Sequence, residues 1–482
     1  MRLISYFRRY QLDLVLTIII AFASIILGLL IGLFDSALPS FLILIACVFL
    51  IVLFKKPEFL LFLWLILSPL LREYLNISGG GIPNITLDRI IIIPLFIYTL
   101  VVPLFKAKLV ESDVSYYKDT MLNGLLVLYC TFELIGYLRG PWPITTSLQY
   151  FLDRSLLPIM VFWLARFFAL KDQKGFPKNI IIGLIIIGFY SIIIEVLRRN
   201  GFESFIYPNG RTYIWDDVKN SRAVGELYNP AIFGAVLTIS LGTFYFLTRY
   251  FKQKRWTVIN ILIISIYSWA IFITYTRSVW VIFLMSFVFA IFMGKYQLQK
   301  IWLFLLIILI CLIIITSTLS ISGTLQFRLF NFSNVDMRIN QIGEYFSMFM
   351  IKPIFGFGAG MFDNLHVSTL STNIGEVITS GIVSHNSILL ILSDRGLSVF
   401  IPYLAILIIF FRRGRGLSRF KYREIQLIVK INWILWIAYF ITAITIQVDY
   451  FPYFICLFWL VQGIICGITQ REIALNQAIK NE

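Results

Sequence analysis

Long apolar runs recur from one end of this chain to the other, and they constrain its fold more than any other feature. Runs of about 18 or more apolar residues are long enough to cross the roughly 30 Å hydrocarbon core of a bilayer as helices. Only 14% of the residues are charged, against about 25% in a typical soluble domain. The runs also lack the period-two alternation of outer-membrane barrels. We therefore predict an all-α, polytopic integral membrane protein. An ordinary cytosolic enzyme, a nucleic-acid-binding module and a disordered scaffold are excluded.

About fourteen spans are expected in a single transmembrane domain over residues 1–482, and twelve are possible. The first is too long for the apolar part of a signal peptide, so we expect it to be retained as a helix. The expected spans lie near residues 12–34, 37–54, 57–71, 89–105, 120–138, 148–168, 179–197, 229–248, 257–275, 278–293, 301–319, 396–411, 428–447 and 451–469.

Lysine and arginine concentrate in alternate loops between these spans, as they do in cytoplasmic loops of membrane proteins. This bias explains the net charge of +16, so binding of nucleic acid is not needed to account for it. It also predicts that both termini are cytoplasmic. Two loops on the opposite side are long, at residues 198–228 and 320–385, and we expect the second to carry part of the active site.

The cysteines and acids give no sign of a metal centre. The five cysteines lie in apolar segments without a Cys-x-x-Cys pair, and no cluster has the spacing of metal ligands. We therefore expect no metal and no cofactor. Glu133, Asp153 and Glu195 fall within spans or near their ends. They are either members of buried ion pairs or parts of a proton relay.

The basic residues expected on the outer side are nearly all arginines. Arginine holds phosphate oxygens with two donors and stays charged at physiological pH, so this bias suggests that a phosphate or another anionic group binds there. Pairing with nearby acids or lipid headgroups is the alternative. The arginines are Arg72, Arg89, Arg139, Arg198, Arg199, Arg211, Arg222, Arg277, Arg328, Arg338 and Arg395, and the exceptions are Lys219 and Lys352.

Two of these arginines have informative surroundings. Arg277 lies where one expected span ends and the next begins almost without a loop, and a charge that close to hydrocarbon needs a partner or a ligand. Arg222 precedes Pro230, which can begin a helix whose first amides would favour an anion. Snorkelling of both side chains to the interface is the alternative.

Two histidines and a glycine cluster lie in or at the end of the second long loop. His385 closes the loop, and its imidazole suits acid–base chemistry near neutral pH, although a lone histidine at a helix start is usually a cap or surface residue. His366 lies in mid-loop. The glycines at 356, 358 and 360 predict a tight turn that lets backbone approach a ligand. They do not form a nucleotide loop, because no βαβ unit surrounds them and no Lys-Ser/Thr follows.

The order of these motifs resembles the bacterial O-antigen ligase and polymerase (Wzy-type) superfamily over roughly residues 220–400. That family's pattern has an Arg, a Pro-x-x-Gly-x-Gly turn and then His-Asn-x-x-Leu, with an acidic residue and Gly further on. The matching elements are Arg222 to Asn229-Pro230, Thr276-Arg277-Ser278 to Trp280, Arg338, Pro353 to Gly360, His385-Asn386 to Leu389, and Asp394 with Gly396. Asp394 stands where the family usually has Glu, and about fourteen spans exceed the twelve of the ligases, so the subfamily stays open.

The resemblance implies a GT-C-like membrane glycosyltransferase at the outer face of the bacterial cytoplasmic (inner) membrane. Its substrate would be an oligosaccharide carried on undecaprenyl diphosphate, and it would use no metal. Arg222 and Arg277 would bind the diphosphate, and His385 would act as base or orient the acceptor. The remaining substrate-binding residues would be Arg338, Asn386, Gly356, Gly358 and Asp394.

Several functions fit this sequence. We prefer a polymerase of surface polysaccharide, such as O-antigen, lipopolysaccharide or exopolysaccharide, because of the extra helices. A ligase that moves the finished chain to lipid A core is the close alternative. A lipid-linked oligosaccharide flippase or transporter, and a non-catalytic scaffold, are alternatives from other classes. Expected partners are the lipid-linked oligosaccharide and membrane lipid, with a chain-length regulator as a possible addition.

Overall fold

A computed structural model describes residues 52–53, 55–71, 77–79, 82–106, 119–202, 222–251, 257–292, 333–363, 385–418 and 422–481. The chain divides into two compact units, residues 1–61 and 62–482. The single transmembrane domain stays a prediction. Nearly all of the first unit lies outside the described residues, so the packing described below is that of the second.

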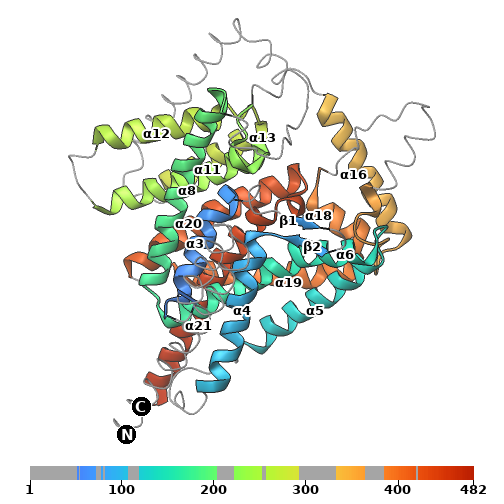
Figure 1. Ribbon diagram of the computed structural model, residues 1–482, viewed down its shortest axis with the longest axis horizontal. Coiled ribbons are helices and arrows are strands. Elements are labelled where there is room, and N and C mark those ends of the chain that lie inside the picture. Colours follow the sequence, from blue (N-terminus) through green and yellow to red (C-terminus); the bar gives the residue numbers. More distant parts are fainter. Residues whose placement is uncertain are drawn as a thin grey trace, which may run out of the picture. The chain divides into compact units, whose positions relative to one another are not determined.

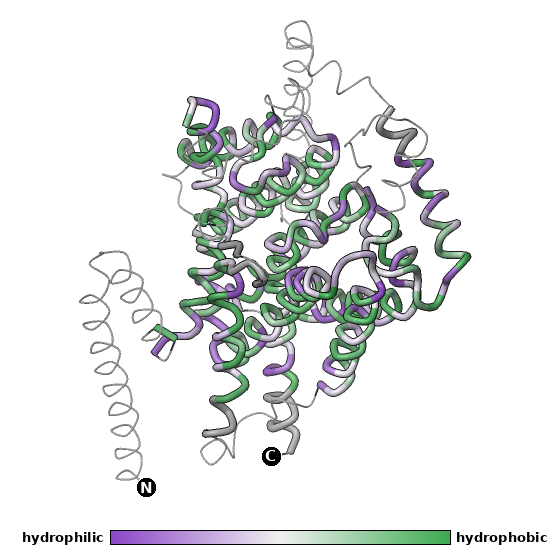
Figure 2. The backbone as a smooth tube through the Cα atoms, turned by 45° about the vertical axis from the view of Figure 1, so that its right-hand side comes forward, coloured by the Kyte–Doolittle hydropathy of each residue, from purple (hydrophilic) through white to green (hydrophobic). Residues whose placement is uncertain are grey.

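The described parts of the chain are mostly helical, and apolar residues run along most of the helices (Figures 1 and 2). The longer helices are α3 (Pro57–Leu71), α4 (Leu87–Lys106), α5 (Thr120–Leu138), α6 (Ile144–Phe151), α7 (Leu157–Lys171), α8 (Gly175–Arg199), α11 (Pro230–Phe251), α12 (Thr257–Phe272), α13 (Arg277–Phe292), α16 (Ser333–Ile351), α19 (Gly396–Leu417), α20 (Arg423–Thr445) and α21 (Pro452–Asn481).

This architecture confirms the prediction of an all-α polytopic membrane protein. By length and composition, 6 helical segments in the described residues can cross a membrane, and three shorter helices are also apolar. Each expected span that falls on described residues coincides with a helix. The expected spans 12–34 and 301–319, and nearly all of 37–54, lie outside these residues, so the total number of spans stays a prediction. A small antiparallel hairpin, β1 (Ile77–Gly79) with β2 (Ile82–Ile85), is an addition to the expected fold.

Helices α7 and α21 pack closely because small residues line their contact. A Cβ atom on Gly463 would overlap the carbonyl oxygen of Phe162, and one on Gly467 would meet the Cβ of Ala169. Glycines four residues apart let two helix backbones approach, which is a common way to join helices in a membrane where lipid removes the hydrophobic driving force. This pair forms the centre against which α4, α19 and α20 pack.

Two of the spans are interrupted by a π-helical turn. Segment η1 (Leu152–Leu156) joins α6 to α7, and η4 (Ile391–Arg395) joins the short helix α18 (Ser387–Leu390) to α19. Each π segment contains an aspartate followed by an arginine, Asp153-Arg154 and Asp394-Arg395. A π turn inserts an extra residue into a helix and redirects side chains, and such turns are frequent at functional sites.

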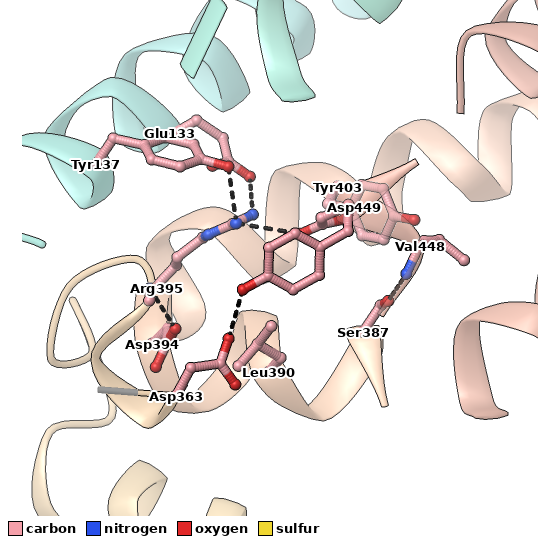
Figure 3. Close-up of polar contacts among 12 residues, drawn as sticks. Glu133, Tyr137, Asp363, Ser387, Leu390, Asp394, Arg395, Tyr403, Val448 and Asp449 are labelled. Atoms are coloured by element: carbon pink, nitrogen blue, oxygen red, sulfur yellow. Dashed lines mark hydrogen bonds and ion pairs between the residues drawn. The ribbon is translucent and has the colours of Figure 1, made fainter. Parts of the chain in front are cut away.

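Arg395 is the centre of a buried ionic network that joins three elements (Figure 3). Its guanidinium donates to Glu133 on α5 at 2.8 Å and to the Tyr137 hydroxyl at 3.1 Å. It also donates to Asp449 at 3.1 Å, in the 3₁₀ turn η5 (Val448–Tyr450). Glu133 therefore belongs to a buried ion pair, and Arg395 binds protein acids rather than an outside anion.

In the π segment η1, the aspartate does not pair with the arginine that follows it in the sequence. Asp153 accepts two hydrogen bonds from Arg89 on α4, at 2.9 and 2.7 Å, and not from the adjacent Arg154. The Arg154 guanidinium lies 4.2 Å from the ring centre of Tyr150 and 4.3 Å from that of Tyr450. Because η5 supplies Tyr450 to Arg154 and the preceding residue to Arg395, it ties the two π segments together.

Replacing Arg395 should destabilise the fold strongly. Arg395→Met leaves two buried carboxylates without their counter-charge, which typically costs about 3–5 kcal/mol. Arg415→Met is the matched control, because Arg415 is exposed near the other end of helix α19, which is expected to face the cytoplasm. Thermal unfolding in detergent should show a clearly lower Tm for the first variant only. Equal Tm values for the two variants would contradict the structural role of the network.

Candidate functional site

The candidate site forms where the loop before α11 meets the turn between α12 and α13. Arg222 donates from Nε to the carbonyl oxygen of Thr274 at 3.1 Å, and from Nη2 to the hydroxyl of Thr276 at 2.6 Å. The amide of Ala223 donates to the carbonyl of Ile273 at 3.0 Å. Thr276 directly precedes Arg277, so these contacts bring Arg222 next to the second candidate arginine. Sequence reasoning did not assign Thr276 this role, although it lies in the quoted Thr-Arg-Ser motif.

A buried carboxylate at the end of α8 holds the Arg222 loop in place. Glu195 pairs with Arg198 at 2.8 Å and with Arg199 at 2.7 Å. It also accepts the backbone amides of Val224 at 3.2 Å and Gly225 at 3.1 Å. Glu195 and its two arginines therefore form a structural pairing, which fits the ion-pair interpretation better than a proton relay.

The start of α11 is already capped from within the chain. The side-chain oxygen of Asn229 accepts the amides of Ala231 at 2.9 Å and Ile232 at 3.2 Å. The first-turn amides that were expected to favour an anion beside Arg222 are thus used by Asn229. Anion binding at this position depends on the guanidinium itself.

Arg338 on α16 adds a third positive charge to this region. Its pKa is lowered, first by burial and then by the charge of Arg277. Its Nε atom is buried and, among the described residues, has no hydrogen-bond partner. An anion bound near these two guanidinium groups would be attracted to both.

His385 is held at the entrance of α18 by its two neighbours. The Asn386 side chain caps the helix, accepting two first-turn amides at 3.1 and 3.0 Å. The Ser387 hydroxyl donates to the carbonyl of Ile446 at 3.1 Å. It also accepts the amide of Val448 at 2.8 Å (Figure 3). These contacts fix the backbone from which the imidazole projects, and they give Asn386 a capping role.

The imidazole of His385 belongs to the same electrostatic group as the arginines. Its pKa is lowered to about 4, first by burial and then by the charge of Arg338. The side chain is therefore neutral between pH 6 and 8. A neutral imidazole can accept a proton, which is what a general base requires.

The glycine cluster forms a tight turn that packs on η4. Gly356, Gly358 and Gly360 have φ angles of 61°, 117° and 81°, which favour glycine. The carboxylate of Asp394 accepts the amide of Gly360 at 2.7 Å and that of Phe362 at 3.0 Å. A Cβ on Gly356 would overlap the Asp394 backbone. The close backbone approach predicted for this turn is thus made to another part of the chain.

The predicted site residues therefore fall into two groups. Arg222 is hydrogen-bonded to Thr276, the residue before Arg277, and the charge of Arg277 acts on Arg338 as that of Arg338 acts on His385. The others, Asn386, Gly356, Gly358 and Asp394, make the caps and turns that shape the backbone nearby. Binding of substrate by any of these residues stays a prediction.

Several other arginines that are expected on the outer side have partners within the protein. Arg139 donates to the carbonyls of Phe355 at 3.0 Å and Gly356 at 3.1 Å. Contacts within the protein therefore explain why arginine rather than lysine occurs at this position and at the positions bound to carboxylates. The arginines bound to acids are Arg89, Arg198, Arg199 and Arg395. The positions Arg72, Arg211, Lys219, Arg328 and His366 lie outside the described residues.

A family model described as Wzy_C, O-Antigen ligase, matches residues 261–404. The matched segment contains Arg277, Arg338, the glycine turn and His385, while Arg222 lies before it. This match confirms the resemblance to the O-antigen ligase/polymerase superfamily. No curated protein matches the chain.

The glycine turn should not tolerate a side chain at Gly360. Gly360→Ala would place a Cβ against the indole of Trp142, at a φ of +81° that L residues rarely adopt. We expect a loss of about 1–3 kcal/mol, seen as a lower Tm in detergent. Gly343→Ala on α16, where a Cβ meets nothing within 4 Å, is the control. A helical alanine there should leave the Tm unchanged or raise it slightly. Equal effects of the two changes would refute the packing of the turn.

Proposed function

We propose that this chain, which carries an O-antigen ligase domain of the O-antigen ligase/polymerase superfamily at residues 261–404, is a bacterial surface-polysaccharide polymerase. It would transfer a growing glycan from undecaprenyl diphosphate to a lipid-linked repeat unit at the outer face of the cytoplasmic membrane. The observation that carries this proposal is the grouping of Arg222, Arg277 and Arg338 with a neutral His385.

The arginines suit a diphosphate leaving group. When the bond between the sugar C1 and the diphosphate oxygen breaks, its electron pair moves to that oxygen. Fixed guanidinium groups stabilise the developing charge and also bind the phosphates with paired hydrogen bonds. Arg222 is aligned by Thr276, and the repulsion between Arg277 and Arg338 is relieved when an anion binds. The chain's own side chains thus supply the charge that this step needs.

His385 would then take the proton of the attacking acceptor hydroxyl. A diphosphate bound at Arg338 offsets the positive charge that lowers the pKa of His385. Donor binding would therefore raise this pKa toward its ordinary value and make the imidazole a stronger base. Base strength would increase only when a donor is present.

The ligase is the second candidate, because the matching family model is described as an O-Antigen ligase. A ligase would pass the finished glycan to lipid A core and would use the same leaving group and base. The preference for a polymerase rests on the expected extra spans, of which 12–34, 301–319 and nearly all of 37–54 lie outside the described residues. The transporter has less support, because Glu133, Asp153 and Glu195 are all held in ion pairs.

Glycan transfer by the purified protein tests the proposal directly. Protein in nanodiscs, given a cognate undecaprenyl-diphosphate-linked repeat, should produce a ladder of longer lipid-linked glycans. Transfer only to added lipid A core would identify a ligase instead. No product with either acceptor, from protein that is folded and supplied with its cognate repeat, would reject both enzymes.

Single substitutions in the site should slow transfer strongly without unfolding the protein. Arg277→Met and Arg222→Met should each reduce the rate by about 10²–10³-fold, the usual effect of removing one group that stabilises a transition state. His385→Ala should reduce it by about 10²–10⁴-fold. Arg415→Met, at an exposed position of α19, should transfer normally. If the site variants kept full activity and an unchanged Tm, the assigned roles would be wrong.

The pH profile should report the charge of Arg338. In the free wild-type enzyme the imidazole stays neutral down to about pH 4. The value of kcat/KM should therefore stay flat from pH 8 to 6 and fall only as the pH approaches about 4. Arg338→Gln removes a positive charge that lowers the pKa of His385, so the acid limb should move to higher pH. Arg338→Lys keeps the charge and should keep the limb near its wild-type position. An acid limb that is the same in all three proteins would exclude His385 as the titrating base.

A further inference from the structure

Helix α16 presents three distinct faces along its described length. One is buried against the protein and contains Gln341 and Tyr345, which are 3% and 1% exposed. The second is polar and exposed, with Asn340, Glu344 and Ser347. At about 100° per residue, a third face lies between them and is wholly apolar. It consists of Ile339, Ile342, Phe346 and Met350, which are 47% to 66% exposed.

The turn that follows α16 continues this apolar face down the side of α5. Ile354 and Phe355 are 61% and 48% exposed. The Phe355 ring lies 6.3 Å from the Phe132 ring on α5, and its carbonyl accepts a hydrogen bond from Arg139 at 3.0 Å. Phe132 precedes Arg139 by about two helical turns, or roughly 10 Å along the axis. The Phe355 ring therefore packs beside α5 about two turns before the end of that helix.

Helix α5 is one of the segments that can span a membrane. Its Val127, Ile135 and Leu138 side chains are 66%, 39% and 48% exposed, as expected for a surface that faces lipid. Since Phe355 packs on the same helix at the same depth, lipid is the environment of Phe355 too. Lys352 beside it places its ammonium 4.5 Å from the Phe357 ring centre. A long basic side chain at this position can reach the headgroups.

We propose that the apolar face of α16, together with Ile354 and Phe355, lies in the acyl chains of the lipid leaflet at the Arg139 end of α5. A helix with an apolar face, a polar face and no charge on the apolar side is typical of an element that lies in the membrane interface. The continuity of this face with the lipid-facing side of α5 favours bilayer lipid over a second copy of the chain. The segment expected as an extracytoplasmic loop, 320–385, thus returns to the membrane over its described first part.

This placement also determines the depth of the candidate site. Arg338 lies on α16 between the buried face and the apolar face, so it is held near the boundary between headgroups and acyl chains. If the proposed function holds, a diphosphate carried on a lipid would meet Arg338 at its own level in the membrane. The test below measures membrane contact alone, so its failure would leave glycan transfer as a separate result.

Fluorescence quenching can distinguish the apolar face from the polar one. The environment-sensitive dye NBD would be attached to a cysteine in a full-length chain whose five native cysteines are replaced. Phe346→Cys and Ser347→Cys form one matched pair of adjacent residues, and Ile339→Cys with Asn340→Cys forms a second. Each protein would be placed in phosphatidylcholine vesicles with or without a lipid that carries a doxyl quencher near its headgroup.

We expect the doxyl lipid to reduce the emission of dye at 346 and 339 by about half, because an interfacial helix buries its apolar face among acyl chains. Aqueous iodide should quench the dye at 347 and 340 and spare the other two positions. Iodide quenching of all four positions would overturn the proposal. Protection of 346 and 339 from both quenchers would also overturn it, because it would mean that protein covers the face. The second pair keeps the result decisive if one labelled variant fails to fold.

Discussion

The packing around the candidate site depends on the contacts of the buried Arg395 guanidinium. A charge in an apolar interior is stable only with counter-charges and hydrogen bonds, and Arg395 obtains them from α5 and from η5. Removing Arg395 would leave two buried carboxylates without a counter-charge, so this residue favours the arrangement in which the three elements meet. The short helix α18 directly precedes η4, so its position follows from that arrangement.

The π turn η4 allows two adjacent residues to serve different parts of the fold. Arg395 points into the network with α5 (Figure 3), whereas Asp394 accepts the amides of Gly360 and Phe362 at the glycine turn. At the other end of α18, Asn386 and Ser387 fix the backbone that carries His385. The candidate base is therefore held by contacts at both ends of one short segment. Such fixation is what proton transfer in a defined geometry requires.

The arginines of this protein divide by the way their charge is balanced. Those that stabilise the fold have a carboxylate or backbone carbonyls as partners, as Glu195 shows for the end of α8. In the candidate group, Arg222 also donates to a backbone carbonyl, and the pKa of Arg338 is lowered first by burial and then by the charge of Arg277. Like charges brought near one another favour an anion beside them, which agrees with the role that we propose for these residues.

The sequence by itself determined the helical membrane architecture, because a backbone in hydrocarbon must satisfy its own hydrogen bonds and a helix does so within one segment. Spans such as 57–71 and 120–138 therefore match the structure at both ends. The motif order also sufficed to select Arg222, Arg277 and His385 as candidates and to indicate the family.

Only the tertiary structure decided which charges pair. Arg395 and Glu133 are separated by 262 positions, and Asp153 binds Arg89 rather than its neighbour Arg154. No local pattern encodes such contacts, because they depend on which helices pack together. For the same reason, only the packed structure showed that Asp394 accepts hydrogen bonds from the glycine turn and that one apolar face of α16 is exposed.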